Sequence, residues 1–311
     1  MKKILLALAV LASMQVANAQ VKSAADAKKA VEAAEAAASN EKKAIKTATW
    51  IKLGQEYVKA YDAPTGNIIP GSSKTELALM MGSEKPVSTE AVEIQGTPYT
   101  KEVYADKNLY FNANGQLAVI EVTKPVYADA LEKAIAAYQK AYDLDASHSK
   151  SKDIAAAFDL IGQKYNTEAY NKYTLGDLAS ASKYFEKAAE VEALAPLSKI
   201  DTTSIYNAGF TAWATKDMSK AKELFEKCYN LGYYYEGGEV FAKLADVDTL
   251  NTKKYLEEGF EKFPQSQSIL IGLINYYLKS NESTDRLFEL LDKAKANEPN
   301  NASLFYVEGN I

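Results

Sequence analysis

Residues 204–228 read SIYNAGFTAWATKDMSKAKELFEKC, and this stretch decides the fold. Ala208, Gly209 and Ala212 are small and fall at helical spacing, so they share one face of a first helix. Asp217 marks a turn after that helix. The second helix carries a small, an aromatic and a small side chain on one face: Ala221, Phe225 and Cys228. The stretch therefore predicts a pair of closely packed helices.

The same pattern returns along the chain. An upstream copy has a Gly-Asp turn, then the same helical face and a proline: Gly176, Asp177, Ala181, Phe185, Ala188 and Pro196. A looser downstream copy is interrupted by Gly237-Gly238 and carries Leu256, Gly259, Phe260 and Pro264. A further copy has Leu287, Leu291, Ala294 and Pro299. Proline ends each second helix because it has no backbone N–H to donate, so tandem copies in register indicate stacked helix pairs.

The first copy is divided in two. Its first helix is marked by Trp50, Leu53, Gly54 and Tyr57. Its second helix appears only after residue 126 and is marked by Ala134, Tyr138 and Ala141. Residues 62–126 therefore form an insert within the first helix pair.

Over residues 47–311, apart from the insert, the chain resembles the tetratricopeptide repeat (TPR) family, whose units of about 34 residues each form two antiparallel helices. The resemblance implies an all-α fold, a right-handed α-solenoid of helical hairpins with a small helix-plus-sheet insert. The expected boundaries after the insert are units near 127–146, 162–196, 202–232, 233–264 and 268–299. From residue 302, Phe305, Gly309 and Asn310 resemble the start of another unit, so we expect the sequence to stop within a repeat; the alternative is a short terminal helix.

The insert predicts a small α+β module. A loop rich in Pro and Gly precedes a short helix over residues 74–81 that ends at Gly82. Apolar residues then alternate with polar ones, and Asn112-Ala113-Asn114-Gly115 predicts a hairpin turn. We expect two or three strands, which need the helices for stability.

The insert also resembles the helix-then-sheet module of outer-membrane-assembly lipoproteins of the OmlA type. The residues that carry this resemblance are Gly71-Ser72-Ser73-Lys74, Leu77, Gly82, Tyr104, Leu109-Tyr110-Phe111 and Asn114-Gly115-Gln116-Leu117. The resemblance implies a role in envelope assembly, whereas the alternative is a sheet that only covers the open side of the first unit.

The N-terminus has the features of a secretory signal peptide. Lys2 and Lys3 precede an apolar run at residues 4–11, which is too short to span a bilayer of about 30 Å. Ala17-Asn18-Ala19 predicts cleavage after Ala19, and Gln20 rather than a lipid-accepting cysteine follows. We expect a signal peptide at 1–19, an exported or periplasmic protein that is not a lipoprotein, and a helical segment over 20–61; an uncleaved anchor is the alternative.

Charge and composition exclude several partners. Without Lys2 and Lys3 the chain keeps 34 basic against 41 acidic residues, a net charge of about −7, and Arg286 is its only arginine. A nucleic-acid binder carries a basic face, so we expect no nucleic-acid partner. No second apolar run has membrane length, so we expect no stable membrane insertion after cleavage.

The sequence offers little catalytic chemistry. The single histidine, His148, lies in a polar linker, and Cys228 occupies a small core position. Two such residues cannot form a zinc site, and no Gly-rich phosphate loop is present. We expect no catalytic residue, no metal and no cofactor, and hence a protein that is not an enzyme.

A binding surface remains. The inner, concave positions of the first helices hold aromatic residues, which suit protein or ligand contacts: Tyr170, Tyr173, Tyr206, Phe210, Trp213 and Tyr276. The alternative for each is packing between repeats. The favoured function is a periplasmic scaffold that binds a protein or peptide partner during envelope or outer-membrane complex assembly; the alternative is a glycan- or peptide-binding module that serves uptake.

Overall fold

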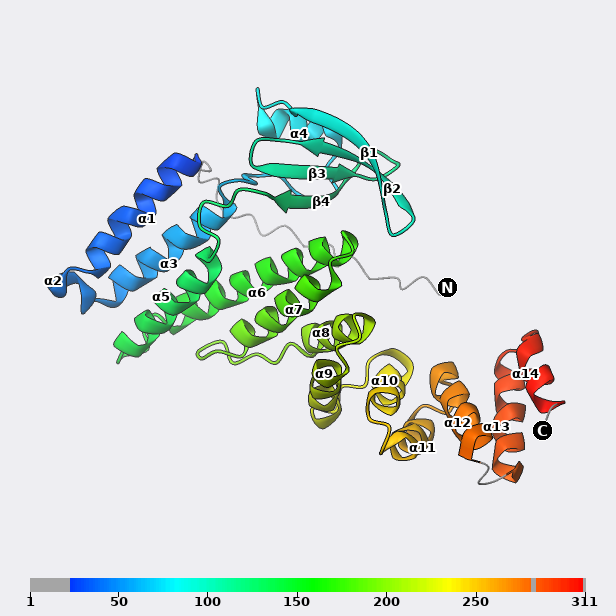
Figure 1. Ribbon diagram of the computed structural model, residues 1–311. Helices are drawn as coiled ribbons and strands as arrows, with labels where there is room; N and C mark the ends of the chain where they lie inside the picture. The colour runs from blue at the N-terminus through cyan, green and yellow to red at the C-terminus, as the bar shows by residue number, and fades with distance from the viewer. Residues whose placement is uncertain (1–22, 281–283, 310–311) are drawn as a thin grey trace.

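The computed structural model describes residues 23–280 and 284–309, so the predicted signal peptide lies outside the described residues. Within the described residues the chain forms an array of helices, with one four-stranded sheet alongside the N-terminal half of the array (Figure 1). The helices before and after the sheet pack in consecutive pairs, so the fold is a helical repeat. None of the described helices combines the length and the apolar character needed to span a membrane.

Five helix pairs make up the array. The first pair joins α3 (Thr47–Asp62) to α5 (Ala130–Leu144) across the insert. The others are α6 (Ser151–Thr174) with α7 (Leu178–Glu192), α8 (Thr202–Ala214) with α9 (Met218–Asn230), α10 (Glu239–Val247) with α11 (Thr252–Lys262), and α12 (Gln267–Ser280) with α13 (Thr284–Asn297). Helix α6 has 24 residues and is longer than its partner α7, which has 15.

Two of the turns are built alike. In the turn before α7, Gly176 has a φ of +82°, and Asp177 caps the helix by accepting a hydrogen bond from the Ser180 amide at 3.1 Å. In the turn before α9, Lys216 takes the left-handed position with a φ of +67°, and Asp217 caps the helix in the same way. A short turn of this kind returns the chain beside the preceding helix and produces the antiparallel pair.

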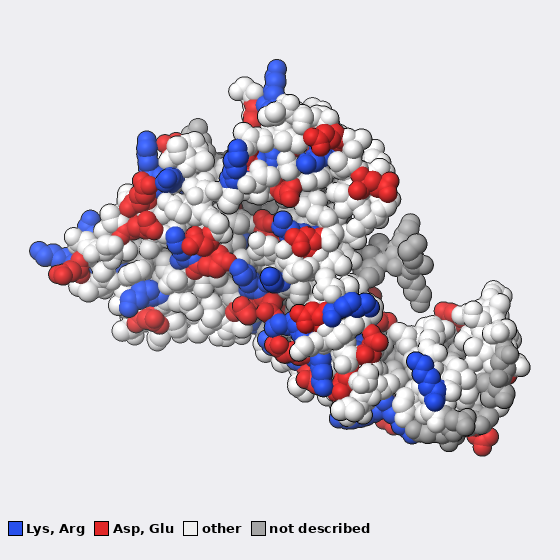
Figure 2. Space-filling model, viewed as in Figure 1, with Lys and Arg blue, Asp and Glu red and all other residues white. Residues whose placement is uncertain are grey.

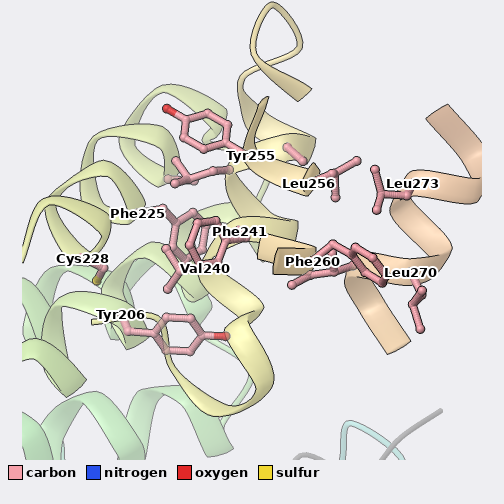
Figure 3. Close-up of a cluster of buried hydrophobic side chains, with 14 of the residues drawn as sticks. Tyr206, Phe225, Cys228, Val240, Phe241, Tyr255, Leu256, Phe260, Leu270 and Leu273 are labelled. Atoms are coloured by element: carbon pink, nitrogen blue, oxygen red, sulfur yellow. The ribbon is translucent and has the colours of Figure 1, made fainter. Parts of the chain in front are cut away.

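Small residues let the helices approach closely. Figure 3 shows the core between α8 and α12, where Phe225 and Cys228 of α9 lie near Val240 and Phe241 of α10. A methyl group at Gly209 would lie 3.0 Å from Phe225, a closer contact than most side chains make. The predicted core face Ala221, Phe225 and Cys228 is confirmed, since each residue is fully buried.

The ends of the array differ in packing. At the N-terminal end, α1 (Ala24–Ala38) packs on α3, and the short helix α2 (Glu41–Ala44) follows it. At the other end, α14 (Ala302–Glu308) buries Leu304 against the array and leaves Phe305 and Tyr306 exposed. A short turn, η1 (Glu236–Gly238), precedes α10.

The insert is a sheet with a helix on one face. The expectation of two or three strands is wrong: four antiparallel strands run in the order β1 (Ser88–Ile94), β2 (Thr97–Val103), β3 (Lys107–Phe111) and β4 (Leu117–Val122). Val92 and Ile94 of β1 alternate with the exposed Glu93, so the apolar alternation extends into this strand and only the expected number of strands was too low. The predicted helix is confirmed as α4 (Lys74–Met81), with a capping box between Ser73 and Glu76.

The hairpin turn between β3 and β4 is confirmed. The Asn112 side chain accepts hydrogen bonds from the amides of Asn114 and Gln116, and Gly115 has a φ of +72°. Leu109 and Phe111 of β3 then face Leu77 of α4, which forms a small core separate from that of the helices. The insert therefore has an apolar core of its own, distinct from the cores of the helical array.

Candidate functional site

The first helices of hairpins two to four lie next to one another. Ser204 of α8 donates a hydrogen bond to Asn166 of α6 at 2.8 Å, and Trp213 of α8 contacts α10 through its ring nitrogen. Their partly exposed rings form a surface that we call the aromatic strip, defined by Tyr170 and Tyr173 of α6 and by Phe210 and Trp213 of α8. These four residues belong to the six that the sequence predicted as binding residues.

Trp213 is the most strongly held ring of the aromatic strip. Lys243 of α10 places its ammonium 3.3 Å from the centroid of the indole, and the indole N–H donates a hydrogen bond to Asp246. The nearby Lys216 lies 5.6 Å from the same ring. Two cations and one carboxylate therefore surround a tryptophan that is itself partly exposed.

Lys243 is a desolvated cation. Burial lowers its pKa, and the nearby Lys216 lowers it further, while Glu239 and Asp246 act in the opposite direction. No described carboxylate lies within ion-pair distance of it. A partner that brings a carboxylate to this point would restore the solvation that Lys243 has lost.

Tyr206 does not belong to the open surface. Its side chain is only 5% exposed, and the ring of Tyr235 covers it with centroids 4.0 Å apart and planes 11° from parallel. Phe225 packs against the ring from another side. Burial is the main cause of the raised pKa of its phenol. Tyr206 therefore supports the strip from beneath and does not offer a contact surface, contrary to the sequence prediction.

The loop that covers Tyr206 was missed by the sequence analysis. Residues 232–238 carry three consecutive tyrosines, of which Tyr233 lies 3.4 Å from the Thr203 hydroxyl and Tyr235 stacks on Tyr206. Tyr234 turns to the other side and contacts Phe241. Tyr235 has a φ of +56°, which is uncommon for a bulky residue. The sequence feature that could have indicated this loop is the run of three tyrosines shortly before Gly237-Gly238.

The other predicted residues have separate surroundings. Tyr170 packs edge-on against Phe185 at 5.1 Å, and its hydroxyl lies 3.4 Å from the Asn207 amide nitrogen. Tyr276 is on α12, where its ring meets Tyr277 edge-on and Lys253 lies 5.8 Å from its centroid. Tyr276 is two hairpins beyond Trp213, so it does not complete the same patch.

Cys228 and His148, the residues considered for catalysis, have different surroundings. Cys228 is fully buried, and burial raises the pKa of its thiol to about 12. His148 is exposed in the turn between α5 and α6, with its ring 5.7 Å from that of Tyr142. Within residues 23–280 and 284–309, no three His, Cys, Asp or Glu side chains come together as metal ligands would.

Charges on the molecular surface are mixed. On the face shown in Figure 2, Lys and Arg side chains are interspersed with Asp and Glu over both the insert and the helices. Many of them pair, as Lys187 does with Glu132 and Lys164 with Asp62. This face therefore offers no extended region of one sign for a polyanion.

Comparison with known proteins shows a likeness to solved structures alone. No family model matches the chain, and no curated protein matches it. Among solved structures it is similar to the C-terminal part of a TPR repeat-containing protein from Cytophaga hutchinsonii, at 15% identity and a TM-score of 0.35, over 91% of this chain and 94% of that one. The assignment of a helical repeat accordingly rests on the packing of the chain's own helices.

Proposed function

We propose that the chain is a scaffold of the TPR kind, built as a right-handed solenoid, that binds a protein or peptide partner along the aromatic strip. The observation that carries the proposal is the group Phe210, Trp213 and Lys243, in which two partly exposed rings adjoin a desolvated cation. Aromatic side chains with few rotatable bonds are typical of binding hot spots, and a half-buried cation beside them can meet a carboxylate of the partner. A peptide segment with an apolar side chain next to a carboxylate suits this group.

A glycan ligand is favoured less. Sugars bind aromatic side chains by stacking on an open ring face, but the Lys243 ammonium lies 3.3 Å from the centroid of Trp213 and occupies one face. The indole N–H is engaged by Asp246 as well. The remaining surface of the ring suits an apolar side chain better than a sugar.

The proposal places the protein in the cell envelope. It is supported by the charged start, short apolar run and Ala17-Asn18-Ala19 of the first residues, which predict export and cleavage after Ala19. The resemblance of the insert to OmlA-type modules supports a part in outer-membrane complex assembly. The insert sits beside α6, one of the two helices that carry the strip (Figure 1).

The test is affinity capture of the mature protein from its native envelope, with partners identified by mass spectrometry. The double variant Phe210→Ser and Trp213→Ser is expected to lose the partner while it keeps the helical circular dichroism of the wild type. Leu250→Ser is the matched control, because Leu250 is 94% exposed and lies outside the strip. Equal capture by all three proteins would remove the binding site from the strip.

A further inference from the structure

A cavity lies at the junction between the insert and the helical array, away from the aromatic strip. Its volume is about 150 Å³, and it is bounded by β4, the segment after β4, and helices α3, α5, α6 and α7. Figure 1 shows β4 as the strand of the insert nearest to α6. A cavity of this volume holds about one benzene ring, so its occupant is a single small group.

Tyrosine rings form much of the cavity wall. Tyr61 comes from α3, Tyr165 from α6 and Tyr184 from α7, and the last two are stacked with centroids 6.1 Å apart. The ammonium of Lys164 lies 5.5 Å from the centroid of the Tyr61 ring, and that of Lys187 lies 5.5 Å from the centroid of the Tyr165 ring. Neither lysine lines the cavity. Aromatic rings attract cations to their faces, so these walls favour a positively charged group.

One hydroxyl in the wall is poorly partnered. Tyr165 is 2% exposed, and its hydroxyl makes no hydrogen bond of normal geometry within the described part of the chain. The Glu132 carboxylate is near enough to add to the effect of burial in raising the pKa of this phenol, but it does not complete such a bond. A buried polar atom without a well-formed hydrogen bond carries a cost that a suitable ligand would remove. The oxygen can accept a hydrogen bond from an N–H donor of a ligand.

The charges of the lining are mainly acidic. Three glutamates, Glu121, Glu132 and Glu168, line the cavity against one lysine, Lys172. Glu132 already pairs with Lys187. One oxygen of Glu121 accepts hydrogen bonds from Asn108 and Tyr110, which leaves its other oxygen for a ligand. Glu168 accepts a hydrogen bond from the Tyr61 hydroxyl at 2.7 Å, and burial raises the pKa of its carboxyl. A cation in the cavity would stabilise the ionised form of Glu168 and would find several oxygen acceptors around one small volume.

We propose that this junction cavity binds a guanidinium group, supplied by free arginine or by an arginine side chain of a partner. The planar guanidinium presents five N–H donors and stacks on aromatic rings, whereas an ammonium presents three donors from one point. The acceptors offered are the Tyr165 hydroxyl and the carboxylates of Glu168 and Glu121. The chain does not fill the cavity itself, since its single arginine, Arg286, lies on α13 and pairs with Glu257 and Glu289.

The experiment is titration calorimetry of the full mature protein with small guanidinium probes. N-acetyl-arginine amide carries the side chain without a free carboxylate, and free L-arginine adds a carboxylate that can meet Lys172. Binding of both points to a peptide side chain as the source, and binding of free arginine alone points to the amino acid. N-acetyl-citrulline amide has nearly the same shape without the charge, and is expected to bind at least about tenfold more weakly.

Two variants separate ligand binding from folding. Tyr165→Phe removes only the poorly partnered hydroxyl, so the melting temperature should stay equal or rise while arginine affinity falls about fivefold. Glu168→Gln removes a charge and should lower the affinity about tenfold. Tyr142→Phe, outside the cavity, is the control and should change neither quantity. Absence of arginine binding at millimolar concentration, equal binding of citrulline, or unchanged affinity in Tyr165→Phe would each overturn the proposal.

Discussion

The ring of Tyr138 lies directly against the backbone of Gly54, although the insert separates the two residues in the sequence. A methyl group at Gly54 would lie 2.7 Å from the ring atom Cε2 of Tyr138. Gly54 is the small residue of α3 and Tyr138 the aromatic residue of α5, so the contact closes the first helix pair.

Gly54→Ala is therefore expected to destabilise the protein. Alanine improves helix propensity by about 1 kcal/mol, but overpacking against a buried ring costs about 1–3 kcal/mol. The expected net loss in the free energy of unfolding is about 1 kcal/mol, measured by urea denaturation. In a Tyr138→Leu background the clash is absent and Gly54→Ala should stabilise. The same sign in both backgrounds would contradict the contact.

Glu56 is expected to make stability depend on acid. Its carboxyl is 2% exposed and pairs with Lys52 and Lys59. Desolvation by burial would raise its pKa, but the hydrogen bonds and charges of the two lysines outweigh it and lower the pKa from 4.5 to about 2. The stabilisation is fully present above pH 4.5, the unfolded value, and is lost as the pH falls through about 2.

The measurement is urea denaturation of the wild type and Glu56→Gln from pH 7 to pH 2. Because both lysines are exposed, the screened difference at pH 7 should be about 2 kcal/mol, and it should shrink towards pH 2. Glu298→Gln serves as the control, because the Glu298 carboxyl accepts a hydrogen bond from the Asn301 side chain. A difference that stays constant with pH would exclude ion pairing as its origin.

Cys228 is expected to resist thiol reagents in the folded protein. The residue is fully buried and burial raises the pKa of its thiol to about 12, so almost no reactive thiolate exists at pH 8. The reaction with an aromatic disulfide reagent should appear only in urea and should follow the unfolding transition. Rapid labelling of the native protein would mean that α9 opens locally.

Gln95 is expected to hold the insert to the helices. Its side-chain amide donates to the backbone oxygen of Tyr173 at 2.8 Å and to that of Thr174 at 3.3 Å, at the end of α6. Gln95→Asn keeps a residue suited to the φ of +51° but shortens the reach. Losing these hydrogen bonds should weaken the attachment of the insert by about 1 kcal/mol. The exchange rate of the backbone amide hydrogens in β1 and β2 should then rise about fivefold. Exchange in α12 serves as the internal control, and an equal rise there would indicate general destabilisation.

The sequence predicted most of the helical array because its signals are local. Small and aromatic residues at spacings of three and four identify the buried face of a helix, even when the helix that packs on it is unknown. Ala221, Phe225 and Cys228 are an example. The number of strands was underestimated because the turn at Gln95-Gly96, which separates β1 from β2, was not recognised, although Gly96 has a φ of +76°. The pairing of α3 with α5 was inferred because the pattern around Gly54 and the pattern around Tyr138 match the two halves of one repeat.

The candidate site was less accessible to prediction. Phe210 and Trp213 fall on the face of α8 that helical spacing assigns to them. The burial of Tyr206 depends on Tyr235, which reaches it only because Tyr235 adopts a positive φ after Gly232. The junction cavity depends on how the insert docks on α6 and α7, a long-range arrangement that has no periodic signal in the sequence.

The position of the insert also sets an order of folding. Helices α6 with α7 and α8 with α9 are joined by turns at residues 175–177 and 215–217, whereas α3 meets α5 only after residues 63–129 have been brought together. Closing a longer loop costs more entropy, and contacts distant in sequence form more slowly. We therefore expect the first helix pair to assemble after the pairs that follow it. During synthesis, α3 leaves the ribosome before the insert, so it can pair with α5 only after the whole insert has been synthesised.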